Sequence, residues 1–124
     1  RRCLGPNLVV VSDATEGAGM PEGFRYGLAT VQCEVRDGVG MVIGHDAFGG
    51  STTTLDGMLA HLCGTLDWPV PEVAQMLSER PAAIAGVGDR KGRLAAGYDA
   101  DVLVLDEHLR PWRTWVRGTP ALTP

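Results

Sequence analysis

The sequence lacks several features that would assign a protein class at once. No apolar run approaches the roughly 18 residues of a membrane-spanning helix. One lysine stands against ten arginines, the formal net charge is -4, and no basic cluster of the kind that binds nucleic acid is present. We therefore expect neither a membrane nor a nucleic acid as the partner of this chain.

Cysteine is scarce and lies outside any pairing motif. Cys3, Cys33 and Cys63 are odd in number, and none belongs to a Cys-x-x-Cys pair or a Cys/His cluster. A disulfide framework and a zinc site of cysteines are thus excluded, and a cytoplasmic location is the simplest expectation. A Gly-x-Ser-x-Gly motif is absent, and the Gly-Val-Gly of residues 86–88 follows a predicted helix, unlike a dinucleotide fingerprint.

A short apolar run ends at a single acidic residue. Leu8 to Val11 is apolar and mostly β-branched, which predicts a strand buried on both faces, as in a parallel sheet. Asp13 follows this run, and a glycine-rich loop over residues 17–23 comes next. Ligands bind at the carboxyl edge of such sheets and barrels, so Asp13 is a candidate catalytic residue. An aspartate after a strand also commonly caps a turn or a helix, and this alternative stays open here.

The next part of the chain predicts a β-hairpin. A short strand is expected over residues 24–26, and alternating polarity predicts a half-buried strand over 30–36 with Val31, Cys33 and Val35 on one face. The pair Asp37-Gly38 is typical of a type I′ turn, so residues 39–43 are the expected return strand.

Three helices and several short strands are expected after residue 52. Apolar residues at helical spacing from Leu55 to Leu66 predict an amphipathic helix, which threonines of 52–54 cap. A second helix is predicted over 71–79, with Val73, Ala74 and Leu77 toward the core, and a third over 81–85. Beyond residue 92 we expect strands near 94 and over 101–105 and 113–116.

Several stretches between residues 9 and 118 resemble one enzyme family in their order and spacing. They are residues 11–15 with 19–21, 35–39, 50–52, 80–83, 91–106 and 114–118. These stretches resemble the C-terminal part of the N-acetylglucosamine-6-phosphate deacetylase family, within the amidohydrolase superfamily. Residues 92–106 are typical of many amidohydrolases, whereas the Ser-Asp-Ala-Thr of residues 12–15 is closer to the deacetylases themselves.

The resemblance implies an α/β fold in which the C-terminal part of a (β/α)8 (TIM) barrel is followed by strands of a small β-sandwich domain. Residues 1–90 would be the end of the amidohydrolase barrel, with a β-hairpin insertion and helices, and residues 91–124 would be the sandwich strands. A whole barrel takes about 250 residues, so 124 residues without an initial methionine are expected to be a piece of a longer protein. In the family the sandwich also takes strands from the N-terminal end, so we expect the strands after residue 92 to lack partners here.

The resemblance also implies a reaction and a set of site residues. The whole enzyme would hydrolyse the N-acetyl group of N-acetylglucosamine 6-phosphate to glucosamine 6-phosphate and acetate, as a homodimer. Asp13 would be its general base and acid. Phe48, Gly49, Gly50 and Ser51 match a loop that lines the substrate pocket, although the family tends to have Leu-Ala or Leu-Ser where this chain has Phe48-Gly49. A glycine-rich connector before a helix is the competing interpretation of this loop.

The resemblance further implies a divalent metal ion, such as zinc, iron or manganese. Its Glu and two His ligands would lie upstream, so no metal ligand is expected in this chain. His45, His61 and His108 lack partner ligands and are predicted to lie at the surface, and Asp99 and Asp101 are interpreted as structural, although their spacing allows a metal pair. Two alternative functions stay open: another amidohydrolase, and a non-catalytic truncated module that binds a partner.

Overall fold

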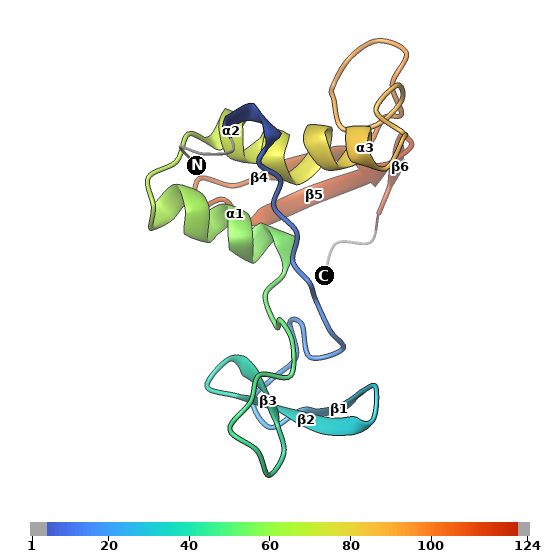
Figure 1. Cartoon of the computed structure of the whole chain (residues 1–124). Coiled ribbons are helices and arrows are strands. Elements are labelled where there is room, and N and C mark those ends of the chain that lie inside the picture. Colours follow the sequence, from blue (N-terminus) through green and yellow to red (C-terminus); the bar gives the residue numbers. More distant parts are fainter. Residues whose placement is uncertain (1–4, 122–124) are drawn as a thin grey trace. The chain divides into compact units, whose positions relative to one another are not determined.

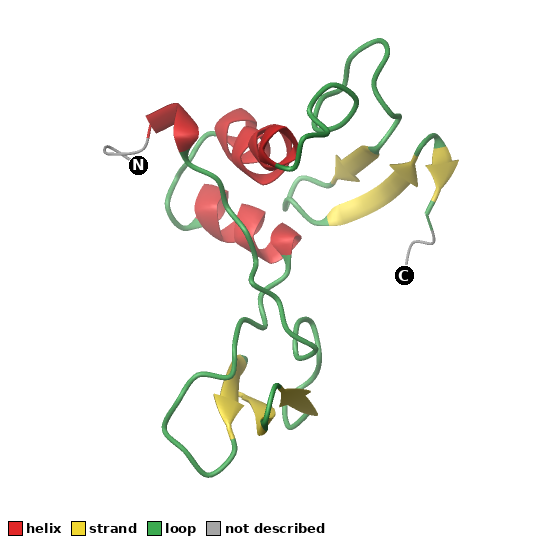
Figure 2. Ribbon diagram, turned by 45° about the vertical axis from the view of Figure 1, so that its right-hand side comes forward, coloured by secondary structure: helices red, strands yellow, loops and turns green. Residues whose placement is uncertain are grey.

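A computed structural model describes residues 5–121, which form parts of two compact units (Figures 1 and 2). The hairpin unit is Ser12–Met58. The helix-sheet unit combines the segment that ends at Val11 with the chain from Leu59 onward. Each unit has its own small cluster of buried apolar side chains. A short 3-10 helix, η1 (Gly5–Asn7), is the first described element.

The hairpin unit contains one antiparallel sheet in the order β1-β2-β3. Its strands are β1 (Arg25–Leu28), β2 (Val31–Arg36) and β3 (Val39–Val42). The predicted type I′ turn is confirmed, because Asp37 and Gly38 both have positive φ, at 52° and 71°. The alternation of β2 is confirmed at its two buried residues, Cys33 and Val35, whereas Val31 is exposed near the end of the sheet.

The core of the hairpin unit consists of Tyr26, Cys33 and Val35, with Phe24 and Val42 packed against it. Tyr26 pairs with Cys33 across β1 and β2, and Cys33 pairs with Val42 across β2 and β3. Three strands of four to six residues cannot bury many side chains, so this unit depends on a few close contacts.

The predicted amphipathic helix is α1 (Leu55–Gly64). Its N-terminus is capped by Thr54, whose Oγ1 accepts a hydrogen bond from the Gly57 N–H at 3.4 Å. Leu59 is buried with Val73 and Met76 in the core of the helix-sheet unit. The helix ends before Leu66, the last residue of the predicted apolar stripe, which is exposed.

The second and third predicted helices form one continuous helical stretch, with no loop between them. They are α2 (Val70–Ala74), a π-helical turn η2 (Gln75–Glu79) and α3 (Arg80–Ile84), after which Gly86 has a φ of +72°. The predicted core face is wrong at Ala74, which is exposed, and it omits Met76, which is fully buried. Met76 lies three positions after Val73 and therefore on the same helix face, whereas Ala74 is about 100° round the helix.

The predicted strand over residues 8–11 is not formed in the described chain. Val11 is 66% exposed, and this segment is instead held by single hydrogen bonds to the helices. The Val10 N–H donates to the Met76 carbonyl oxygen at 3.1 Å, and Arg80 Nη1 donates to the Leu8 carbonyl oxygen at 2.8 Å. A parallel strand requires a neighbouring ladder, and no strand within residues 5–121 pairs with this segment.

The C-terminal strands form their own antiparallel sheet in the order β4-β5-β6. They are β4 (Val102–Leu105), β5 (Pro111–Val116) and β6 (Thr119–Pro120). The expectation that these strands lack partners is therefore wrong, because short turns let them pair with one another. Leu94, where a strand was predicted, is 77% exposed and lies outside any strand. The predicted domain boundary at residue 90 stays a prediction.

Candidate functional site

Asp13 lies in a short side-chain turn of the hairpin unit, which the hydrogen bond between Ser12 and Ala14 closes. Its φ is +49°, a conformation that is uncommon outside glycine and in which aspartate is enriched several-fold. The preceding Ser12 supports the turn, since its Oγ accepts a hydrogen bond from the Ala14 N–H at 3.3 Å. Asp13 is exposed, so its carboxylate is accessible from outside the unit.

The two segments singled out by the sequence lie side by side just after Asp13. Ala14 and Ser51 form a parallel β-bridge. The Ser51 carbonyl oxygen accepts two hydrogen bonds from Thr15, one from the N–H at 3.0 Å and one from Oγ1 at 3.1 Å. The Gly19 N–H extends this contact by donating to the Thr52 carbonyl oxygen at 3.1 Å. The fold thus brings the residue next to Asp13 against Ser51.

Gly49 and Gly50 have no room for side chains. A Cβ on Gly49 would lie 2.6 Å from the Cys33 sulfur, and a Cβ on Gly50 would overlap the Thr15 methyl group. Gly50 also has a φ of +89°, which L side chains rarely adopt. The glycine pair is therefore a packing requirement of this chain, in addition to any role in binding.

Phe48 lies at a different part of the loop. It forms an isolated antiparallel bridge with Met41 of β3, and 79% of the residue is exposed. The structure brings Gly50 and Ser51 to Ala14 and Thr15, and it attaches Phe48 to the edge of the hairpin.

The glycine-rich loop after Asp13 is tied to the tip of the hairpin. The Glu22 carboxylate accepts hydrogen bonds from the Asp37 N–H at 2.8 Å and from the Gly38 N–H at 3.3 Å. Thr52 Oγ1 donates to the Gly38 carbonyl oxygen at 2.5 Å. Both flanks of the candidate site, residues 14–22 and 49–52, are thus attached to the same turn.

Tyr26, Glu22 and Thr15 support this site, although the sequence alone does not single them out for that role. Tyr26 Oη donates a hydrogen bond to the Gly49 carbonyl oxygen at 2.7 Å and is buried. A backbone carbonyl carries no signal in the sequence, so such a contact could not be inferred from residue types. For Glu22, an acidic residue 15 positions before a type I′ turn gives no local pattern either.

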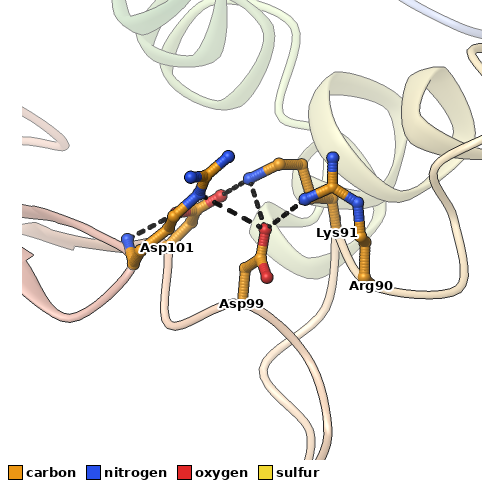
Figure 3. Close-up of polar contacts among 5 residues, drawn as sticks. Arg90, Lys91, Asp99 and Asp101 are labelled. Atoms are coloured by element: carbon orange, nitrogen blue, oxygen red, sulfur yellow. Dashed lines mark hydrogen bonds and ion pairs between the residues drawn. The ribbon is translucent and has the colours of Figure 1, made fainter.

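Asp99 and Asp101 belong to a separate ionic cluster in the helix-sheet unit (Figure 3). Lys91 Nζ contacts Asp99 Oδ2 at 2.9 Å and also bonds to Asp101, while Arg90 Nη1 lies 2.7 Å from Asp99 Oδ2. The Arg117 N–H donates to Asp101 Oδ1 at 2.9 Å. These contacts occupy both carboxylates, which supports a structural role over a metal pair.

Hydrogen bonds in this cluster shift the pKa values of its charged side chains. The hydrogen bond from Lys91 is the main reason that the pKa values of Asp99 and Asp101 lie below 3.8. The same contacts, with that to Asp101 first, raise the pKa of Lys91 above 10.5. The cluster therefore keeps its charges throughout the neutral pH range.

The residues described do not fit a metal centre by themselves. Within residues 5–121 no group of three or more His, Cys, Asp or Glu side chains gathers in a way that could hold a metal ion. His45, His61 and His108 are exposed. In the same part of the chain no helix is both long and apolar enough to cross a membrane.

The fold and the sequence together define the class of the chain. The amidohydrolase family model matches residues 23–123, so the chain belongs to the amidohydrolase family. Within this family, the chain is 33% identical over 111 residues to N-acetylglucosamine-6-phosphate deacetylase of Danio rerio, a match that covers 90% of this chain and 27% of the relative. The resemblance noted from the sequence is thereby confirmed.

Two further comparisons extend this result. The chain is 30% identical to N-acetylgalactosamine-6-phosphate deacetylase of Escherichia coli O157:H7, over 94% of this chain and 30% of the relative. It also superimposes on the solved structure of a mutant N-acetyl-D-glucosamine-6-phosphate deacetylase from Mycobacterium smegmatis in complex with N-acetyl-D-glucosamine-6-phosphate, with a TM-score of 0.87 and 28% identity. That match covers 98% of this chain and 32% of the solved chain, so this chain spans about a third or less of these relatives.

Proposed function

We propose that this chain is part of a longer protein that hydrolyses the N-acetyl group of an N-acetylated amino-sugar 6-phosphate. The favoured substrate is N-acetylglucosamine 6-phosphate, and the products are glucosamine 6-phosphate and acetate. The observation that carries the proposal is the bridge between Ala14 and Ser51, because it sets the segment Gly49–Ser51 beside the turn that bears Asp13. The similarity to deacetylases over 90% or more of the chain supports the choice of reaction.

Asp13 is the proposed acid and base of the reaction. Hydrolysis of the amide forms a bond from a water oxygen to the acetyl carbon and breaks the bond from that carbon to the sugar nitrogen. The Asp13 carboxylate takes a proton from the water and gives it to the leaving amine, which departs as a neutral group. The exposed position of Asp13, on a turn held by backbone contacts at Thr15, suits a group that must meet a substrate.

The segment Phe48–Ser51 is the proposed substrate-binding loop. Ser51 offers a half-buried hydroxyl group next to the turn of Asp13, and the absence of side chains at Gly49 and Gly50 lets the segment pack against Cys33 and Thr15. The exposed ring of Phe48 offers an apolar surface at the outer end of the loop.

We further propose that the longer protein binds a divalent metal ion. The family resemblance implies such an ion, but the described residues offer no cluster of ligands, so its Glu and His ligands are proposed to lie upstream of this chain. The same resemblance underlies three further proposals: the end of a TIM barrel in residues 1–90, a homodimer, and a cytoplasmic location.

N-acetylgalactosamine 6-phosphate is a second candidate substrate. The chain is as close to an N-acetylgalactosamine-6-phosphate deacetylase, at 30% identity, as it is to the N-acetylglucosamine-6-phosphate deacetylase of Vibrio furnissii. The two sugars differ in the configuration of one hydroxyl group.

The experiment that tests the proposal is an acetate-release assay on the full-length protein with added divalent metal. We expect turnover of N-acetylglucosamine 6-phosphate, slower turnover of its galactose epimer, and little turnover of N-acetylglucosamine without the phosphate. Faster turnover of the epimer would reassign the substrate. Absence of acetate release from all three sugars would overturn the proposal.

The intact mass of the native protein decides between the enzyme and the non-catalytic module. A mass several times the 13.1 kDa of this chain is expected, because the proposed metal ligands must lie elsewhere in the protein. A native mass near 13.1 kDa would favour the module, whose isolated chain should bind a partner without releasing acetate.

A further inference from the structure

We infer that Tyr26 is a positioning residue for the proposed deacetylation, because its buried hydroxyl group fixes the substrate-binding segment Gly49–Ser51. The inference rests on the proposed function and adds a residue that makes no contact with the reacting atoms. All of the residues that carry it belong to the hairpin unit, Ser12–Met58.

Tyr26 is buried in β1 and directs its hydroxyl group to the segment. The residue is 3% exposed, and its Oη donates a 2.7 Å hydrogen bond to the Gly49 carbonyl oxygen. Buried phenol groups usually have a partner, and here the partner is the backbone of the segment itself. The position of Gly49 is therefore coupled to the position of the Tyr26 ring.

Two glycines enclose the ring and limit where it can move. A Cβ on Gly17 would lie 2.6 Å from Tyr26 Cε1, and a Cβ on Gly40 would overlap the Tyr26 hydroxyl oxygen. Gly17 belongs to the loop after Asp13, and Gly40 belongs to β3. Because backbone lies on both sides, the hydroxyl group has little freedom to leave the Gly49 carbonyl.

The segment is held between Tyr26 and the loop that follows Asp13. On one side the Gly49 N–H donates to the Gly40 carbonyl oxygen at 2.6 Å, in addition to the Tyr26 bond at the Gly49 carbonyl. On the other side Thr15 donates two hydrogen bonds to the Ser51 carbonyl oxygen. Loss of the Tyr26 hydroxyl group therefore loosens one anchor of a segment whose other anchor is two residues from Asp13.

The alternative is that Tyr26 contributes only to the core. Its ring packs with Cys33 and Val35, and the Phe24 ring is stacked 6.5 Å away between centroids. Tyr26→Phe separates the two roles, because it keeps the ring and removes only the hydroxyl group. Phe24→Leu is the matched control, because it disturbs the same apolar cluster and leaves the Tyr26–Gly49 hydrogen bond in place.

The first measurement is amide hydrogen exchange on the full-length protein. In Tyr26→Phe we expect faster exchange at Gly49 and Thr15, whose N–H groups anchor the segment, and unchanged exchange at Cys33 and Val35 in β2. In Phe24→Leu we expect no such selective change at Gly49 and Thr15. Unchanged exchange at these two amides in Tyr26→Phe would overturn the inference.

The second measurement is steady-state kinetics with N-acetylglucosamine 6-phosphate. A loosened binding segment should raise KM by about tenfold in Tyr26→Phe and leave kcat within about twofold, as expected when a buried acceptor loses a side-chain donor. A purely structural role would lower the active fraction and hence kcat, with KM unchanged, and would overturn the inference, as would a Tyr26→Phe protein that fails to fold. Inactive wild-type protein would overturn the proposed function and, with it, the expected change in KM. The hydrogen-exchange result would still show whether Tyr26 holds the segment Gly49–Ser51 in place.

Discussion

Two glycine-rich loops of the chain contain aspartates, and the contacts of these aspartates differ between the two loops. In the loop of residues 89–101, Asp99 and Asp101 are bound by Lys91, Arg90 and the Arg117 backbone. In the loop that begins at Ser12, the structure records no hydrogen-bond or ion-pair partner for the Asp13 carboxylate among residues 5–121. The second loop is held by backbone contacts instead, through Thr15 to Ser51 and through Gly19 to Thr52.

The contrast between the two loops shows that the surroundings of an aspartate, and not its residue type, distinguish a structural role from a candidate catalytic one. Lys91 and Arg90, which precede Asp99 by eight and nine positions, close this loop on itself, and the Arg117 side chain adds an ion pair to Asp99 from 18 positions away. Asp13 is set by the conformation of its own turn, with a φ of +49°, and by the bridge that follows it. Substitutions in the two loops should therefore act on different properties.

The largest effect is expected from Asp13→Asn in the full-length protein. Loss of a general acid and base should lower kcat for acetate release by about a thousandfold, and the substitution keeps the size of the side chain, so folding should be retained. The measurement is kcat, together with the thermal unfolding midpoint. Wild-type turnover by this variant would remove Asp13 from the mechanism.

Asp99→Asn is the matched control for this prediction. It makes the same chemical change in the other loop, where it removes the charge that Lys91 and Arg90 contact. We expect kcat to stay within about twofold of wild type and the unfolding midpoint to fall. A thousandfold loss of kcat in this variant would show that the two loops do not differ in the way described.

A smaller effect is expected from Gly50→Ala, which tests how the Asp13 loop is held. Alanine here combines an unfavourable φ of +89° with overlap of the Thr15 methyl group, so we expect a loss of about 2–4 kcal/mol in the free energy of unfolding. Gly44→Ala is the control, because Gly44 has a similar φ of +80° and no atom within 4 Å of a Cβ. The control should cost only about 1 kcal/mol, and urea titration measures both. Equal losses would mean that the contact with Thr15 does not constrain the loop.

The smallest effect is expected from Lys91→Met in the ionic loop. At pH 7 the variant should unfold at a lower temperature than wild type, by less than Gly50→Ala does, because the pairs are partly exposed to solvent. The lowered pKa values of Asp99 and Asp101 stabilise the fold above 3.8, and this contribution is lost as the pH falls through their folded values. The raised pKa of Lys91 stabilises the fold below 10.5, and this contribution is lost as the pH rises through its folded value.

The difference in thermal unfolding midpoint between wild type and Lys91→Met should therefore be constant between about pH 5 and about pH 9. It should become smaller below pH 3.8. Thermal unfolding midpoints measured across this range check the prediction. A difference that grows as the pH falls below 3.8 would contradict the assignment of the stabilisation to these ion pairs.

Local signals in the sequence predicted the parts of the fold that depend on neighbouring residues. The hairpin follows from Asp37-Gly38 and from the alternation around Cys33, and α1 follows from the apolar spacing after Thr54. The structural interpretation of Asp99 and Asp101, which the family resemblance implies, agrees with their ion pairs to Lys91 and stays a prediction.

Features that depend on distant backbone could not be predicted in this way. Tyr26 and Gly49 are 23 positions apart and meet through a carbonyl group, which every residue has. The apolar run of residues 8–11 predicted a strand, but hydrophobicity does not supply the ladder that a strand requires. The adjacency of Ala14 and Ser51 likewise follows from the path of the whole hairpin unit and from no local motif.

The enclosure of Tyr26 by Gly17 and Gly40 has a consequence for how this chain can evolve. With tyrosine at position 26, a methyl group at either glycine meets the ring or its hydroxyl group, so such a change should destabilise the hairpin unit. A smaller residue at position 26 relieves the collision with the ring at Gly17 and leaves a Val35 methyl group 3.2 Å from the added carbon, whereas at Gly40 the Gly50 carbonyl oxygen still lies 2.9 Å away. The effect of a substitution at position 17 therefore depends on the residue at position 26. We expect related proteins to carry a side chain at position 17 only where position 26 is no longer tyrosine.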